Sequence, residues 1–148
     1  MRTEKERTKK FGDLVKRMER ALGEENGVTL QTLKSLGIRL KDNGEYEEAI
    51  NVYERCLTGR MKVFGEDHND TLMTLNNLGV VYRRLKNDEK ALEYYERALE
   101  GKERTMGTKH PNTLSTVINI ANIYRADKDY GKAEELYQRV LEGREAQS

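Results

Sequence analysis

The same residues recur along this chain at intervals of 42 positions. The recurring features are a Thr-Leu pair, single alanines and tyrosines, and two sets of glycines. They stand at Thr29-Leu30, Thr71-Leu72 and Thr113-Leu114, at Ala49, Ala91 and Ala133, at Tyr53, Tyr95 and Tyr137, at Gly23, Gly65 and Gly107, and at Gly59, Gly101 and Gly143. A period of this length is typical of a solenoid, in which each unit buries its apolar face against its neighbours.

Each unit contains two stretches with apolar residues three and four positions apart, the spacing of one helix face. The units cover residues 29–70, 71–112 and 113–148, and the same register places half a unit over residues 5–28. We therefore expect one domain over residues 1–148 with about seven helices. The helix in the half unit is the least regular, because Arg7 stands where the later units have Ala49.

Several residues predict where helices end. Gly44 suits a left-handed helix exit, and Asp88 and Asp129 suit the caps of the following helices. Pro111, the only proline, is expected in a loop, where its missing donor is harmless. The glycines at 59, 101 and 143 indicate either close helix approach or an early helix end.

This frame resembles the tetratricopeptide repeat. The resemblance rests on Leu33-x2-Leu36-Gly37-x2-Leu40 followed by Ala49-x3-Tyr53, and on its copy from Leu75 to Tyr95. The third copy has Ala121 in the glycine position. The eight residues beyond the usual 34 resemble the long variant of kinesin light chains. The resemblance implies an all-α, right-handed superhelical solenoid of antiparallel helix pairs.

In the family that it resembles, the first helix of each repeat lines a concave groove that binds peptides. The resemblance maps the groove positions here to Lys34, Ser35, Ile38, Lys41, Asn76, Asn77, Val80, Arg83, Arg84, Ile118, Asn119, Asn122 and Arg125. The first helices, expected over 29–42, 71–87 and 113–128, contain eight Lys or Arg against two Asp. The second helices carry acids such as Glu47, Glu93 and Glu134. A basic groove favours acidic peptides, and asparagine amides can hold a peptide backbone.

Composition narrows the function classes. The net charge of +1 argues against bulk attraction to nucleic acid or to an anionic membrane. With one Cys, no apolar stretch long enough to span a membrane and no secretory signal, we expect a cytoplasmic protein. Cys56 is expected to be a buried thiol, and His68 and His110 to serve loops rather than a metal. No catalytic constellation is recognisable, so we expect neither an enzyme nor a cofactor.

Two hypotheses remain open from the sequence. The first is a scaffold or adaptor that binds an extended or short helical, acidic segment of a protein partner. The second is a self-assembling module, or a fragment of a larger signalling protein, because the array starts with half a repeat and shows no polar capping helix.

Overall fold

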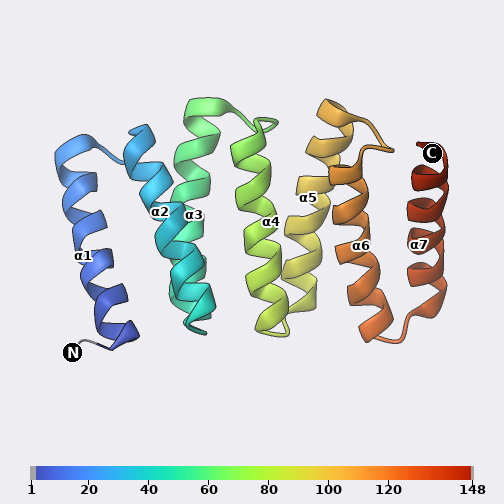
Figure 1. The fold of residues 1–148 in the computed structure, drawn as a ribbon, viewed down its shortest axis with the longest axis horizontal. Helices are drawn as coiled ribbons and strands as arrows, with labels where there is room; N and C mark the ends of the chain where they lie inside the picture. The colour runs from blue at the N-terminus through green and yellow to red at the C-terminus, as the bar shows by residue number, and fades with distance from the viewer. Residues whose placement is uncertain (1–2, 148) are drawn as a thin grey trace.

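The computed structural model describes residues 3–147, which form one continuous array of antiparallel helices (Figure 1). Seven helices and no strand lie in this part of the chain. In chain order they are α1 (Glu4–Leu22), α2 (Gly27–Asp42), α3 (Tyr46–Phe64), α4 (Asn69–Arg84), α5 (Asp88–Met106), α6 (Pro111–Ala126) and α7 (Tyr130–Glu145). The predicted all-α solenoid of about seven helices is thus confirmed.

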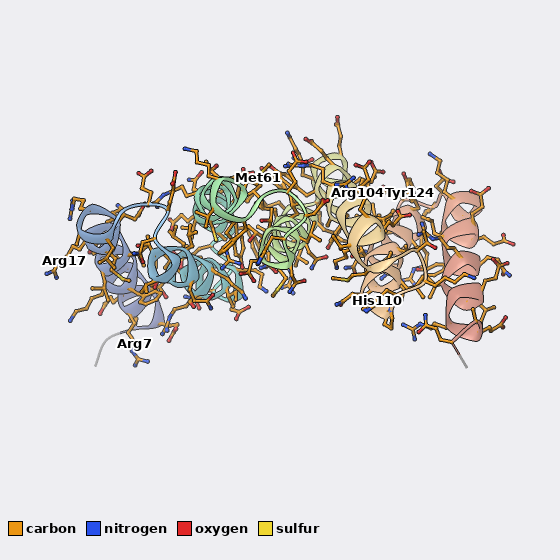
Figure 2. All side chains as sticks on the ribbon, turned by 90° about the horizontal axis from the view of Figure 1, so that it is seen from above. Arg7, Arg17, Met61, Arg104, His110 and Tyr124 are labelled. Carbon is orange, nitrogen blue, oxygen red and sulfur yellow. The ribbon has the colours of Figure 1, made fainter. Side chains whose placement is uncertain are left out.

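The helices form two layers. Seen from above, α2, α4 and α6 lie in one row, and α3 and α5 lie in the other (Figure 2). Each helix packs on the helices next to it in the chain, so the core is a continuous strip between the rows. No helix of residues 3–147 is long and apolar enough to cross a membrane.

Polar side chains start the helices. His68 and His110 cap α4 and α6, because each Nδ1 accepts from the backbone N–H two residues later, at 3.1 and 3.0 Å. Asp129 caps α7 as predicted, but Asn87 caps α5 in place of Asp88. The predicted cap of α5 is therefore one residue too late. Asp88 is the first residue of the helix, where its negative charge is favourable.

The prediction that Pro111 lies in a loop is wrong, because it is the first residue of α6. The first N–H of a helix has no partner within that helix, so a proline fits there as well as in a loop.

The positions that follow the first helix of each pair need a left-handed backbone. Gly44 confirms the predicted exit with φ = 78°. One and two repeats later, Lys86 and Lys128 adopt the same conformation, with φ of 60° and 64°. This conformation is costly for residues with a Cβ. The packing of the flanking helices therefore holds Lys86 and Lys128 in a conformation that these residues would not adopt on their own.

The recurrent helical glycines allow close packing. A Cβ at Gly59 would lie 2.5 Å from Leu30 Cδ2, and one at Gly101 would lie 2.3 Å from Leu72 Cδ2. Gly143 meets Leu114 in the same way. The alternative of an early helix end is wrong, since the helices continue through all three glycines.

Two buried basic side chains connect each helix pair to the next pair along the chain. Arg60 of α3, only 2% exposed, donates to the backbone oxygen of Asp70 in α4 and lies 3.5 Å from its carboxylate. One repeat later, Lys102 of α5 donates to the backbone oxygen of Asn112 and to Thr116 Oγ1 in α6. The sequence analysis missed this feature, although the two bases obey the 42-residue period.

The α1 helix is held at fewer points than the other helices. Only Thr8 and Val15 are buried among its residues. Asn43 Nδ2 donates to Thr8 Oγ1 at 2.9 Å, and Arg39 forms an ion pair with Glu4 at 2.8 Å. The thiol of Cys56, by contrast, lies in the centre of the core as predicted, and burial raises its pKa.

Candidate protein-interaction surface

Twelve of the thirteen predicted groove residues occupy equivalent places on α2, α4 and α6, and Arg84 is an additional base next to Arg83 on α4. None is buried: Ser35, Arg84 and Arg125 are exposed, and the other ten are half-buried. Their core neighbours on the same helices, such as Leu33, Leu75 and Val117, are almost fully buried. The 3.6-residue helical period therefore places these thirteen side chains outside the fully buried stripe of each helix. We call the surface that they form the basic face.

One pair of the basic face is in direct contact. Arg83 Nη2 of α4 donates to the backbone oxygen of Asn122 in α6 at 3.4 Å. The Tyr137 hydroxyl donates to the Asn122 side-chain oxygen, which is therefore already occupied. By contrast, the amides of Asn76, Asn77 and Asn119 make no hydrogen bond to residues 3–147 and remain available for a ligand.

The structure reduces the basic charge expected from the sequence. Arg39 is directed to Glu4 of α1 rather than to the basic face. Lys86 and Lys128 lie in the turns after α4 and α6 rather than within these helices. The helices end at Arg84 and Ala126, before the ends that the sequence predicted at 87 and 128. The bases left on the face are Lys34, Lys41, Arg83, Arg84 and Arg125.

Two carboxylates that the sequence analysis did not bring together lie at one end of the basic face. Burial, followed by a hydrogen bond and charge repulsion from Asp127, raises the pKa of Asp88, while the Arg83 charge opposes that shift. Asp88 begins α5 and Asp127 follows α6, so the contact is between turns that are far apart in the sequence. Arg83 thus has an acidic neighbour, whereas Arg84 and Arg125 are exposed bases.

The acids lie in the other row, as the sequence predicts. Those with exposed side chains on α3, α5 and α7 include Glu47, Glu48, Glu93, Glu96, Glu134 and Glu135. Helices α2, α4 and α6 together carry six Lys or Arg against two Asp, whereas α3, α5 and α7 carry thirteen Asp or Glu against ten Lys or Arg. The two rows therefore differ in the sign of their net charge. No group of three His, Cys, Asp or Glu side chains that could hold a metal occurs within residues 3–147.

The comparisons agree with this architecture. The family model for the tetratricopeptide repeat matches residues 40–104 and again residues 70–146. None of the curated proteins matches the sequence.

Solved structures with a similar fold include BtubC (BKLC) from P. vanneervenii, with a TM-score of 0.85 and 25% identity over 97% of this chain. A putative kinesin light chain from Podosopora anserina, with nearly identical TPR-like repeats, has a TM-score of 0.85 and 21% identity over 98%. The apo form of RapI has a TM-score of 0.76 and 21% identity over 97%. The chain spans 57%, 69% and 50% of these three chains, respectively.

Proposed function

Because the chain belongs to the tetratricopeptide repeat family of protein–protein interaction modules, we propose that it is a scaffold or adaptor whose basic face binds an acidic segment of a partner. The observation that carries this proposal is the separation of charge between the two rows of helices. Five bases lie on the basic face of α2, α4 and α6, whereas on α3, α5 and α7 the acids outnumber the bases by thirteen to ten. Such a field attracts an acidic segment to one side of the molecule and repels it from the other.

The half-buried asparagines give the face a second property. An asparagine amide both donates and accepts, so Asn76, Asn77 and Asn119 can pair with the backbone of an extended segment of any sequence. Arg84 and Arg125 then add selectivity, because a guanidinium binds a carboxylate through two parallel hydrogen bonds. The proposed ligand is therefore an extended or short helical peptide with at least two acidic side chains.

Charge reversal tests this proposal. The double variant Arg84→Glu/Arg125→Glu should weaken the binding of an acidic peptide selected from an array by about tenfold or more, because rim charges act through steering and ion pairing. Both residues are exposed, so the thermal unfolding of the variant should match the unmodified chain. Arg83→Glu is a poorer variant, because the guanidinium of Arg83 also joins α4 to α6.

The control is Arg144→Glu, which makes the same substitution as each half of the double variant at an exposed position of α7, a helix that does not contribute to the basic face. Affinity for the peptide should be almost unchanged in this variant. The single variants Arg84→Glu and Arg125→Glu match its charge change and should each weaken binding. If the double variant binds as tightly as the control, the basic face is not the binding surface.

A second candidate function, self-assembly, is favoured by exposed apolar side chains on α7. Leu141 is 51% exposed, whereas Leu57, its equivalent two repeats earlier, is 4% exposed. Tyr130 is also exposed. Light-scattering mass measured against concentration, with Leu141→Glu as the variant, tests this candidate. A mass that stays monomeric at all concentrations would exclude it.

A further inference from the structure

The gaps between neighbouring second helices differ along the array. Between α3 and α5 the gap is filled by Tyr94, which is 7% exposed and stacks on Tyr82 with ring centroids 5.4 Å apart. The Tyr94 hydroxyl donates to the Glu54 carboxylate, and the Arg97 guanidinium lies 5.5 Å from the ring centroid. One aromatic side chain thus has apolar, polar and cationic contacts in this gap.

One repeat earlier the same three places hold smaller residues. Val52 stands in the place of Tyr94, Leu40 in the place of Tyr82, and Gly12 in the place of Glu54. All three line a cleft of about 620 Å³ between α1 and α3. The cleft therefore exists because the side chains that fill the next gap are reduced here, as when a core residue is truncated. Its volume lies in the range of ligand pockets.

A carboxylate provides a polar group in this cleft. Glu45 lines it and occupies the N-cap position of α3, but its side chain makes no capping bond. One of its oxygens, Oε2, is shielded from solvent and has no hydrogen-bond partner within residues 3–147. At the equivalent place Asn87 caps α5. The Glu45 carboxylate thus has no competing donor, and a ligand hydroxyl that meets it in the cleft gains affinity once the side chain turns its oxygen outward.

We propose that this cleft binds the side chain of a tyrosine from a protein partner. The phenol ring lies against Leu40 and Val52, and its hydroxyl donates to Glu45. The chain itself provides the precedent, because Tyr94 makes the same kinds of contact in the next gap. A tyrosine satisfies both requirements of the cleft, an apolar ring and a donor at its tip.

This site is separate from the basic face. None of the thirteen residues of that face lines the cleft, whose walls come from α1 and α3 and whose floor includes Leu36 and Leu40. The two proposals can therefore fail independently, and variants in the cleft leave the bases of the other face unchanged.

Small probes and methyl NMR spectra test the proposal on the full chain. N-acetyl-tyrosinamide should shift the methyl signals of Leu36, Leu40 and Val52, and saturate them with a dissociation constant of roughly 1 mM, as expected for so small a ligand. N-acetyl-phenylalaninamide, which lacks the hydroxyl, should bind about 3- to 10-fold more weakly. In Glu45→Met that difference should disappear, while the phenylalanine probe binds as before.

Filling the cleft provides the second arm. Gly12→Glu/Leu40→Tyr/Val52→Tyr copies the filled gap between α3 and α5, and should abolish the saturable shifts of both probes at Leu36. Val52→Tyr alone, with less change to the core, should weaken both probes if the triple variant does not fold. Circular dichroism confirms folding in each case. Unchanged binding to either filled variant, or equal affinity for the two probes, would overturn the proposal.

Discussion

The buried base of α5 offers a quantitative test of how the repeats are joined. At the preceding joint, Arg60 lies 3.5 Å from the Asp70 carboxylate. At its own joint Lys102 is 9% exposed, and no carboxylate within residues 3–147 lies within ion-pair distance. Its Nζ donates to Thr116 Oγ1 at 2.8 Å and to the backbone oxygen of Asn112 at 3.4 Å. Position 112 is one repeat after Asp70, so the substitution Asn112→Asp places an equivalent acid at this joint.

The expected gain follows from two contributions. Asp70 and position 112 are both the second residue of a helix, where a negative charge is favourable by about 0.3–1 kcal/mol. An ion pair with a partly exposed acid adds roughly 0.2–1 kcal/mol after desolvation and side-chain ordering are subtracted. We therefore expect Asn112→Asp to raise the free energy of unfolding by about 1 kcal/mol, equivalent to roughly 2–4 °C in Tm.

A double-mutant cycle with Lys102→Met separates the two contributions. Urea unfolding of the four proteins should give a coupling of about 0.5 kcal/mol or more between positions 102 and 112. The helix-terminus contribution should persist in the Lys102→Met background. A coupling of zero would refute the claim that an acid at position 112 pairs with Lys102.

The pH dependence provides a further check of the same reasoning. Burial lowers the pKa of Lys102 from its ordinary value of 10.5, so the unfolded chain binds more protons between the folded and unfolded pKa values. Stability must therefore rise with pH in that window. Relative to Lys102→Met, the unmodified chain should gain stability as pH rises toward 10.5, and Asn112→Asp should reduce that gain. A relative loss in this window would contradict the assigned cause.

Three further predictions concern packing and backbone. Gly101→Ala should destabilise the fold by about 1–3 kcal/mol, since its Cβ would lie 2.3 Å from a methyl of the facing leucine. Gly131→Ala, at a helical position where the added Cβ makes only an ordinary contact of 3.9 Å with Asp129 Oδ1, should stabilise the fold by up to about 1 kcal/mol. Thermal unfolding of the pair distinguishes packing from helix propensity. Lys86→Gly should stabilise by about 0.5–1 kcal/mol because its φ is 60°, and unfolding in urea would refute this if the midpoint fell. Cys56 should react with a thiol reagent only as fast as the chain opens, because it is buried and its pKa is raised, and a rapid reaction in the native state would contradict this.

The sequence was sufficient to predict the helices and their number, because a strict period repeats the same packing three times. The packing of Gly59 and Gly101 against leucines is the clearest example, since recurrence itself indicated a constraint at those places. Helix ends were less predictable. Asn87 and Asp88 are adjacent polar residues that could both cap, and only the backbone geometry decides between them.

Contacts between repeats were the hardest to predict from sequence. Arg60 and Lys102 recur with the period, yet long basic side chains are usually exposed, so their burial follows only from the position of the next helix. The pairing of Asp88 with Asp127 likewise depends on how two turns meet across α5 and α6. The groove assignment of the thirteen residues stays a prediction.

The period therefore carries two kinds of information in this chain. Where it is kept, as at Leu30, Leu72 and Leu114, it specifies the packing of each pair and the course of the solenoid. Where it is broken among buried residues, it changes the surface without changing the fold. Tyr94 closes one gap and Val52 leaves the preceding one open, although the helices around them are alike. Because a solenoid transmits little strain beyond neighbouring repeats, such local departures are tolerated. Binding sites in this molecule should then be sought at the residues that depart from the repeat.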